Sequence, residues 1–385
     1  MLNKPRREPI STRRKVLKTI GVAGVATTIG SSGAAAQSNK NEIEDWNDFN
    51  ALREDLDGEY VLVADLDKNT VGYDEHVANP DGGFESIGSR GTPFTGTFDG
   101  QDNEIQDVVI DRPDEDGVGL FGLTSTDAVI IDTILVDFEI NGGSEVGGLI
   151  GGNDGEVTRV FVNGTITATG STAGGLIGRN YGIITESVAS GAVEGGDNAG
   201  GLVGSNAGEI ADSAASGEVS GKIRVGGLVG AQSRETVRDI EGEIQESFAI
   251  AEVSGDRDVG GLVGHGNTFG QVTASYWDTT VSGHQDGVGD GGDEAVTGLT
   301  TAQMQGEAAG ENMSALNFEE TWQVATDPAD YPVLRSQSSE RFAKFFAQDT
   351  TEGSSGNSVP GFGIGSGTVA VGVCGYILKR RVTGH

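Results

Sequence analysis

Carboxylate side chains are the most abundant groups in this sequence that could do chemistry. The chain of 385 residues contains 58 Asp and Glu residues against 25 Lys and Arg residues, a formal net charge of −33. Four of the carboxylates lie in the glycine-rich segment DGVGDGGDE at 286–294. Because Ca²⁺ prefers oxygen ligands, Asp286, Asp290 and Asp293 form a candidate calcium site. The segment lacks the acid spacing of an EF-hand, so a solvated acidic loop is the alternative interpretation.

Paired carboxylates could also cleave a polysaccharide. Hydrolases place two carboxyl groups across a glycosidic bond, and some lyases combine carboxylates, often with Ca²⁺, and an Arg or Lys base. The acids nearest such an arrangement are Asp99, Asp102, Glu104, Asp107, Asp132 and Asp137. No acid column repeats in register beside a basic residue, so we predict no catalysis. A polysaccharide lyase or glycoside hydrolase acting on extracellular glycans is the alternative, with the insertion at 231–238 as the first place to look.

Nucleotide, nucleic-acid and zinc chemistry fit this sequence poorly. The only Gly-Lys pair, Gly221 and Lys222, is followed by Ile223 where a phosphate-binding loop needs Ser or Thr. A strongly acidic body repels polyanions, which excludes nucleic acid as a partner. The HExxH helix of zinc peptidases is absent, and His76, His265 and His284 show no ligand spacing.

The first 36 residues resemble a twin-arginine export signal. Arg13 and Arg14 are followed by the apolar stretch 20–29 and then by small residues, with a cut expected between Ala36 and Gln37. The resemblance implies the Tat translocase as a partner during export. It also implies that the chain folds before it leaves the cell.

The last 27 residues, 359–385, resemble the PGF-CTERM sorting signal of archaeal surface proteins. A polar spacer at 341–358 leads to Pro360, Gly361 and Phe362, then to an apolar run that ends at Leu378 before three bases. The resemblance implies that an archaeosortase-like enzyme removes this segment and that a membrane lipid takes its place. A plain transmembrane anchor is the alternative, and both place the body of the chain at the cell surface.

A repeated motif organises the middle of the chain. The motif GGL[IV]G begins at Gly147, Gly174, Gly200, Gly226 and Gly260, and a degenerate copy begins at Val118. Each unit contains three short, β-branched clusters separated by turn residues, which predicts three strands per unit. Stacked units then form columns of equivalent residues, one of which is Leu120, Leu149, Leu176, Leu202, Leu228 and Leu262.

This periodicity predicts an all-β fold, a right-handed parallel β-helix (β-solenoid). The other expected columns are Phe121, Ile150, Ile177, Val203, Val229 and Val263; Ile140, Ile166, Val193, Val219, Val253 and Val281; Ser187, Ser213, Ser247 and Ser275; and Asn153, Asn180 and Asn206. We expect the asparagines to hydrogen-bond to one another at a coil corner. The paired glycines serve corners that need positive φ or a backbone without side-chain bulk.

Both ends of the coil need covers because they expose strand edges. Trp46, Phe49, Leu52 and Leu56 lie on one predicted helical face, which gives a short N-terminal helical cap. We assign 37–93 to this cap and the first strands, 94–285 to the repeats, and 286–340 to a small C-terminal cap. Trp322 and Tyr331 belong to that second cap.

The repeats resemble GLUG-motif surface proteins, and the acidic charge and tail indicate a halophilic archaeal type. The resemblance rests on GGL[IV]G, FTGTFDGQDNEI at 94–105, SYWDTTVSG at 275–283 and the GLTTAQM to YPVL ending, and it covers roughly 44–335. It implies architecture more than activity, because such repeats occur in adhesin-like proteins and beside catalytic domains.

We therefore predict an exported, surface-anchored structural or adhesin-like element of the cell envelope without catalysis. Its lateral faces would contact envelope glycans or surface proteins, and a spacer that binds nothing is a further alternative. Asn163 and Asn312 begin sequons and are candidate glycosylation sites on an exported protein. The single cysteine, Cys374, allows no intramolecular disulfide.

Overall fold

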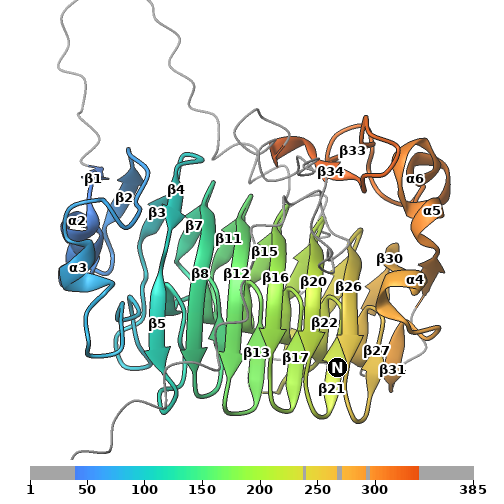
Figure 1. Ribbon diagram of the computed structural model, residues 1–385, viewed down its shortest axis with the longest axis horizontal. Coiled ribbons are helices and arrows are strands. Elements are labelled where there is room, and N and C mark those ends of the chain that lie inside the picture. Colours follow the sequence, from blue (N-terminus) through green and yellow to red (C-terminus); the bar gives the residue numbers. More distant parts are fainter. Residues whose placement is uncertain (1–39, 237–239, 267–270, 292–294, 338–385) are drawn as a thin grey trace, which may run out of the picture. The chain divides into compact units, whose positions relative to one another are not determined.

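Successive coils of parallel strands make up the body of the protein. A computed structural model describes residues 40–236, 240–266, 271–291 and 295–337, all within one compact unit that starts at Lys40. Strands of one coil pair in parallel with the equivalent strands of the next, and four sheets run along the stack (Figure 1). The prediction of a parallel β-helix is confirmed.

Two of the sheets carry nine strands each. Sheet A consists of β1 (Asn41–Ile43), β2 (Glu59–Leu62), β3 (Thr97–Asp99), β7 (Val129–Ile131), β11 (Glu156–Thr158), β15 (Ile183–Thr185), β19 (Glu209–Ala211), β25 (Glu243–Gln245) and β29 (Gln271–Thr273). Sheet B has the longest strands and consists of β4 (Glu104–Gln106), β5 (Val109–Arg112), β8 (Ile134–Gly142), β12 (Phe161–Ala168), β16 (Val188–Glu194), β20 (Ala214–Ser220), β26 (Phe248–Ser254), β30 (Ser275–Asp278) and β32 (Val296–Leu299).

The other two sheets flank the glycine motif. Sheet C consists of β6 (Phe121–Leu123), β10 (Ile150–Asn153), β14 (Ile177–Asn180), β18 (Val203–Asn206), β22 (Val229–Gln232), β28 (Val263–His265) and β31 (Val288–Asp290). Sheet D consists of β9 (Val146–Gly147), β13 (Thr172–Gly174), β17 (Asn198–Gly200), β21 (Arg224–Gly226) and β27 (Val259–Gly260). A full coil therefore has four strands, one more than predicted, because two residues of the motif form a bend that divides one cluster into a strand of sheet D and a strand of sheet C.

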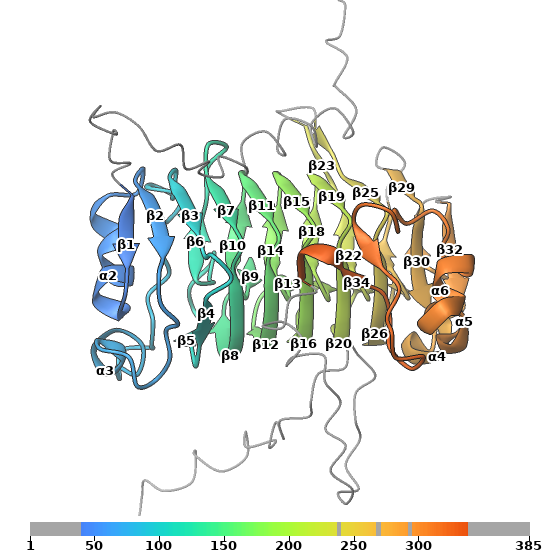
Figure 2. The same ribbon diagram turned by 90° about the horizontal axis from the view of Figure 1, so that it is seen from above.

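The coil is right-handed. In Figure 1 the strands of sheet B face the viewer, and β8 runs downward from the level of β4 to the level of β5. Figure 2 places β7, β11 and β15, which precede the strands of sheet B, behind them. The chain thus turns clockwise as it advances away from the N-terminal end, in agreement with the usual hand of parallel crossovers.

Apolar columns fill the inside of the coil. All six residues of the leucine column, and the six that follow them in sequence, are fully buried. Ile150, Ile177 and Val203 lie in register on neighbouring strands of sheet C. Each buried leucine side chain contributes about 1.5–3 kcal/mol, so the column stabilises every interface between coils. The prediction of internal columns at these positions is confirmed.

The third apolar column holds over five coils and fails at the sixth. Ile140, Ile166, Val193, Val219 and Val253 lie in register along sheet B. The prediction for Val281 was wrong, because this residue lies in the one-turn helix α4 (Thr279–Ser282). The side chain of Asp278 accepts the N–H groups of Thr280 and Val281, an N-cap that ends strand β30 and starts the helix.

Polar side chains in two ladders form hydrogen bonds with one another and with backbone groups that are buried at the corners of the coil. Asn153 Nδ2 donates to Asn180 Oδ1 at 2.9 Å, Asn180 Nδ2 donates to Asn206 Oδ1 at 2.8 Å, and Asn206 Nδ2 donates to Gln232 Oε1 at 2.9 Å. The expected asparagine contacts are therefore confirmed, and Gln232 extends the ladder by a coil. The serine column forms a second ladder in which each backbone N–H donates to the next serine Oγ, for example Ser187 N to Ser213 Oγ at 3.2 Å.

An aromatic plug closes the N-terminal end. Helix α2 (Trp46–Ala51) continues into the 3-10 turn η1 (Leu52–Glu54), and Asp45 caps its first turn. Phe49 packs against the rings of Phe84, Phe98 and Phe121 at centroid distances of 5.6–6.3 Å. A short helix, α3 (Tyr73–His76), lies beside it. The predicted helical cap is present, with Trp46, Phe49 and Leu52 buried.

A tryptophan closes the other end of the coil. The indole of Trp277 belongs to the main apolar core, and its Nε1 donates to the carbonyl oxygen of His284 at 3.1 Å. Gly261, Gly287 and Gly298 surround it, and a Cβ atom on any of them would lie within 3.0 Å of the ring. Strand β31 pairs with β28 and strand β32 pairs with β30, so the parallel strands of the coil continue past Trp277 to Leu299.

The C-terminal segment packs on the outside of sheet B. A second apolar cluster joins the outer side chains of that sheet to helices α5 (Thr301–Met304) and α6 (Gly306–Asn312) and to strands β33 (Trp322–Gln323) and β34 (Val333–Leu334). The turn η2 (Arg335–Gln337) follows β34. The rings of Phe248 and Trp322 lie 5.0 Å apart, and Gln337 Nε2 donates to the carbonyl oxygen of Val160 at 3.1 Å. The segment thus turns back along several coils (Figure 2).

The insertion in the longest unit forms a small hairpin. Strands β23 (Arg234–Glu235) and β24 (Ile240–Glu241) pair in antiparallel fashion, and Arg234 Nε lies 3.7 Å from Glu241 Oε1. The coil resumes in register at β25, where Ile244 pairs with Ile210. The extra residues therefore leave the coil and return to it.

Candidate functional site: polar columns on the coil surface

The glycine corners bring sheets C and D into direct backbone contact. A Cβ atom on Gly174 would lie within 3.0 Å of the carbonyl oxygen of Ile177 and of the amide nitrogen of Gly204. A Cβ atom on Gly175 would lie within 3.0 Å of the carbonyl oxygen of Gly201. Neither glycine has positive φ, so close approach, and not left-handed backbone, explains the repeated glycines. They leave no room for a phosphate ligand at the corner.

Polar side chains line the outer edge of these corners in two adjacent columns. On the sheet D side the column is Glu145, Thr172, Asn198, Arg224 and Asp258, and on the sheet C side it is Gly152, Arg179, Ser205, Ala231, His265 and Asp290. We call these two columns the corner stripe. Its residues follow directly from the register of the motif, which places one outward position on every coil.

Opposite charges pair at the N-terminal end of the corner stripe. Arg179 Nη2 lies 2.8 Å from Glu145 Oε1, and Arg90 Nη2 lies 3.4 Å from Glu145 Oε2. Only 8% of the Glu145 side chain is exposed, and the guanidinium of Arg179 also lies over the ring of Tyr181. In the middle of the stripe Arg224 Nη1 donates to Asn198 Oδ1 at 3.2 Å. The charge of Glu145 is thus neutralised by arginines, whereas Arg224 has only a neutral hydrogen-bond partner among these contacts.

The C-terminal end of the corner stripe has a different composition. Asp258, His265 and Asp290 lie together, with one ligand atom of each within 4.8 Å of the others. His265 Nδ1 lies 3.5 Å from Asp290 Oδ2 and finds no hydrogen-bond partner among the described residues. Arg257 Nε lies 3.6 Å from Asp258 Oδ2, but 65% of the Arg257 side chain is exposed, so this pair contributes little.

This arrangement corrects our view of the segment at 286–294. Residues 285–289, QDGVG, are a seventh, degenerate copy of the motif, in which Val288 pairs with Val263, and Asp290, directly after it, pairs with His265. Gly287 stands where the other copies have leucine, and the ring of Trp277 fills that place. Of the candidate calcium ligands, Asp286 is exposed, Asp290 lies beside His265, and Asp293 is outside the described residues.

A second column runs along the corner between sheets A and B. Its members are Asp102, Asp132, Arg159, Glu186, Asp212, Glu246 and Ala274, all with φ between 47° and 56°. The statement that no acid column repeats in register beside a base was wrong, because Arg159 follows Asp132 in this column and binds both of its carboxylate oxygens, with Nη2 2.8 Å from Oδ2. The left-handed backbone recurs on seven successive coils whatever the side chain, so it is a property of the corner.

The charges in this column perturb one another. Burial, followed by the charge of Asp132, raises the pKa of Asp102, while Arg159 acts in the opposite direction. The hydrogen bond to Asp132 raises the pKa of Arg159. A carboxyl group with a raised pKa beside a carboxylate and a guanidinium is a combination found in polysaccharide-cleaving sites. The bidentate pairing with Asp132, however, keeps Arg159 charged and unsuited to act as a base.

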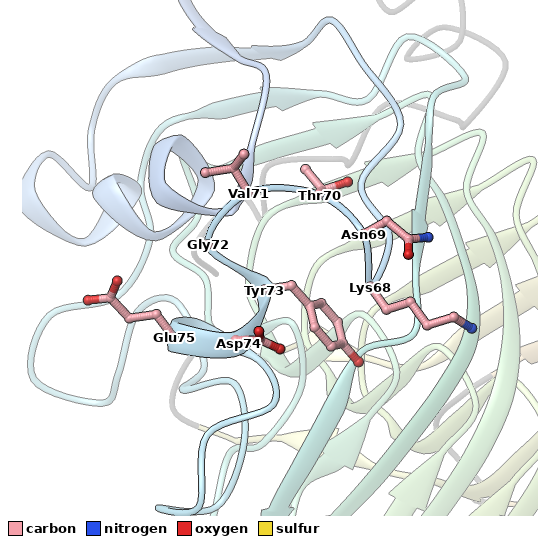
Figure 3. A pocket seen from close by; sticks show the side chains of 8 residues that line it. All are labelled: Lys68, Asn69, Thr70, Val71, Gly72, Tyr73, Asp74 and Glu75. Carbon is pink, nitrogen blue, oxygen red and sulfur yellow. The ribbon is translucent and has the colours of Figure 1, made fainter.

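A surface hollow of about 360 Å³ lies beside the N-terminal cap, and the loop at 68–75 lines it (Figure 3). Lys68 Nζ lies 3.4 Å from Asp107 Oδ1, and the Tyr73 hydroxyl donates to the carbonyl oxygen of Asp107 at 2.7 Å. Burial, followed by the charge of Asp107, raises the pKa of Tyr73. The hollow is polar, and its lysine already has a carboxylate partner, so the contacts explain how the loop is held in place.

Several predicted functional residues lie outside the described part of the chain. These are the export residues Arg13 and Arg14, the cleavage pair Ala36 and Gln37, and the sorting residues Pro360, Gly361 and Phe362. Among the described residues, no helix is both long enough and apolar enough to cross a membrane. The export and anchoring assignments stay predictions.

The two sequons occupy different environments. Asn163 is half-buried inside strand β12, on the outer side of sheet B, and does not precede the strand as expected from the sequence. Asn312 ends helix α6, and its Nδ2 donates to the carbonyl oxygen of Ala308 at 2.8 Å. A glycan on Asn312 would replace one of the two Nδ2 hydrogens and leave the other to make that bond, whereas Asn163 lies beside a register shift between β12 and β8.

Sequence reasoning missed the pairing of His265 with Asp290. The signal was present, since VGH at 263–265 and VGD at 288–290 are equivalent copies of the end of the motif. The loss of the leucine from the second copy concealed it. The histidines are scattered in the sequence, but the coil brings one of them between two carboxylates.

The chain has similarities to known proteins both in sequence and in structure. No family model matches the chain, so membership of the GLUG-motif proteins stays a prediction. The chain is 36% identical over 285 residues to Halomucin of Haloquadratum walsbyi, a match that covers 72% of this chain and 3% of Halomucin. The chain therefore corresponds to a small part of that relative.

The structural match concerns the fold. A crystal structure from Bacteroides ovatus, provisionally described as an immunoglobulin A1 protease, superposes with a TM-score of 0.56 at 18% identity. The match covers 78% of this chain and 94% of that one. It supports the parallel β-helix with its covers.

Proposed function

We propose that this chain is a non-catalytic structural or adhesive element at the surface of a halophilic archaeon. The observation that carries the proposal is the match to Halomucin over 72% of the chain, since that relative is named as a mucin and comes from a halophile. A net charge of −33 supports the same setting, because acidic surfaces suit concentrated salt. The chemistry of the repeats supports a structural role, since the glycines, serines and asparagines are used in packing.

Export through the Tat pathway and anchoring through the C-terminal segment belong to this proposal. Arg13 and Arg14 would direct export, with cleavage after Ala36, and Pro360, Gly361 and Phe362 would mark the sorting site. Intact mass of the surface-extracted protein tests both ends at once. Loss of 36 N-terminal residues and of a C-terminal segment that begins near Pro360 is the expected result. A full-length mass, or protein confined to the cytoplasm of fractionated cells, contradicts it.

A binding experiment distinguishes an adhesive role from the role of a spacer that binds nothing. The outer positions of the coil repeat from one coil to the next, which favours weak contacts made many times with glycans or surface proteins of the envelope. The labelled full-length protein should bind isolated envelopes of a halophilic archaeon in concentrated salt and should resist washing. Protein that stays entirely in the wash supports the spacer instead.

A polysaccharide-active enzyme is the second candidate, and the column at the corner between sheets A and B favours it. Asp102, with its raised pKa, is the best general acid in that column. If the enzyme exists, the purified protein releases new reducing ends or unsaturated products from polysaccharides, and Asp102→Asn abolishes the release. The non-catalytic proposal expects neither wild type nor variant to release product.

A further inference from the structure

We propose that Asp258, His265 and Asp290 bind a divalent first-row transition-metal ion, which fastens the last strand of sheet C to the coil. The proposal does not depend on the surface role proposed above. Asp258 precedes β27 of sheet D, His265 ends β28, and Asp290 ends β31. Two strands of sheet C and the residue before a strand of sheet D thus supply one ligand each.

The geometry fits a small cation better than a simple ion pair. His265 Nδ1 lies 3.5 Å from Asp290 Oδ2, longer than an ordinary hydrogen bond, and it has no hydrogen-bond partner among the described residues. Two ligands of a tetrahedral ion at about 2.0–2.2 Å lie about 3.4 Å apart. The third ligand atom, from Asp258, lies within 4.8 Å of the other two, which a rotation of its side chain can shorten.

The equivalent positions on other coils show why this end differs. Four coils earlier, the places of Asp258, His265 and Asp290 are taken by Glu145, Gly152 and Arg179, and Glu145 and Arg179 form an ion pair of 2.8 Å. At the last coil an aspartate replaces the arginine and an imidazole replaces the glycine. The same backbone positions therefore hold an ion pair of opposite charges at one end of the stripe and two carboxylates with an imidazole at the other. The excess negative charge at the second place favours a bound cation.

The neighbouring bases do not supply that cation. Arg257 Nε is 3.6 Å from Asp258 Oδ2, but its side chain is 65% exposed. Arg224, one coil earlier in the same column, donates to Asn198 Oδ1, and no ion pair joins it to Asp258 among the described residues. A metal ion is therefore the better partner for the two carboxylates.

The donor set indicates the class of metal. One imidazole nitrogen with two carboxylate oxygens suits Zn²⁺, Mn²⁺ or Co²⁺, whereas Ca²⁺ takes six to eight oxygen ligands. This differs from the calcium site expected from the sequence, which used Asp286 and Asp293. Strand β31 ends sheet C, where its only described partner is β28, so a metal bond would protect an otherwise open edge.

Metal binding by the full-length protein tests the proposal. The measurement is calorimetry with Zn²⁺, Mn²⁺ and Ca²⁺ in roughly 2 M KCl, where screening of a few Å suppresses loose binding to surface acids. Hydrogen exchange of 286–291, measured with and without Zn²⁺, gives a second readout. The variants are His265→Gln and Asp290→Asn, with Asp286→Asn as a matched control because it removes an exposed acid from the same segment.

The proposal expects saturable Zn²⁺ or Mn²⁺ binding that each ligand variant weakens about tenfold or more, and that Asp286→Asn leaves unchanged. Zn²⁺ should also slow exchange at 286–291 in the wild type and not in His265→Gln. Binding that both ligand variants retain, preference for Ca²⁺ without any effect of His265→Gln, or no saturable binding would each overturn it. Circular dichroism of each variant shows that the coil is folded, and Asp290→Asn serves if His265→Gln is not.

Discussion

The hydrogen bond between Tyr331 and Asp278 should hold the C-terminal segment against the last coil. Tyr331 Oη donates to Asp278 Oδ2 at 2.8 Å, and both side chains are at most 1% exposed. The other oxygen, Oδ1, accepts the N–H groups of Thr280 and Val281 at the start of α4. Burial, followed by the charge of Asp278, raises the pKa of Tyr331 well above its usual value, as expected for a phenol enclosed beside a carboxylate.

Tyr331→Phe removes the hydroxyl and keeps the ring in the apolar cluster. A hydrogen bond to a charged group contributes about 1.5–3 kcal/mol to stability. Since about 1.4 kcal/mol corresponds to a factor of ten, the C-terminal segment should open roughly ten to a hundred times more often. The coil itself should be little affected, because its core does not include Tyr331.

Hydrogen exchange with mass-spectrometric readout measures this opening directly. Amides of α5 and α6 should exchange faster in Tyr331→Phe, while those of β12 and β16 should keep their protection. Tyr73→Phe is the matched control, because it also removes a phenol that donates a hydrogen bond, here to the carbonyl oxygen of Asp107 near the N-terminal cap. It should leave α5 and α6 unchanged.

The reasoning fails if Tyr331→Phe exchanges at α5 and α6 within a factor of two of the wild type. A cycle with Asp278→Asn locates the cause. If the two substitutions add without coupling, the hydrogen bond is not what holds the segment. Faster exchange throughout the coil would show instead that the segment and the coil open together.

Three further predictions concern the coil. Leu202→Asp places a carboxylate in the core and should cost several kcal/mol, unfolding the neighbouring coils; an unchanged thermal melting profile would contradict the internal column. Gly201→Ala should destabilise as strongly in spite of its small size, because its Cβ would lie within 3.0 Å of the carbonyl oxygen of Gly227; wild-type stability in urea would exclude the backbone contact. Burial raises the pKa of Tyr60 to about 12, whereas an unfolded tyrosine titrates near 10. The unfolded chain loses that proton first, so Tyr60 should lower the free energy of unfolding by roughly 1.4 kcal/mol per pH unit between about pH 10 and about pH 12, in addition to the contributions of Tyr73 and Tyr331. An equal slope in Tyr60→Phe would refute the assignment.

The repeated columns made the coil predictable. Spacing alone aligned Leu202 with its equivalents, and in a parallel stack aligned residues must lie over one another. The asparagine ladder followed for the same reason, since Asn153, Asn180 and Asn206 share one place in the unit. The repeat period alone is enough to predict that these columns are buried, and their burial is confirmed.

Three features that the repeat period does not encode were not predicted from the sequence. The division of each unit into four strands depends on how closely sheets C and D approach, which is set by glycine backbones such as Gly174 and Gly178 and leaves no trace in hydropathy. The seventh copy was concealed because Trp277, fifteen residues after Leu262 of the previous copy, fills the place of its leucine from the side. Likewise the C-terminal segment lies along sheet B because Phe161 and Phe248 face outward there, and alternation alone does not say which apolar face has a cover.

Close packing inside the coil limits the positions at which a functional residue can lie. Inside, every position of the motif is occupied by a leucine, a β-branched residue or a glycine with no room for a Cβ atom, so substitution there changes stability. The residue directly after the motif is Gly152, Arg179, Ser205, Ala231, His265 or Asp290, and Arg179, His265 and Asp290 are at least partly exposed there. Its chemistry varies freely because the backbone on either side is already held by the sheets. We therefore expect substitution of an exposed member of the corner stripe, such as Asp290, to change the binding of a ligand there without lowering the melting temperature of the coil.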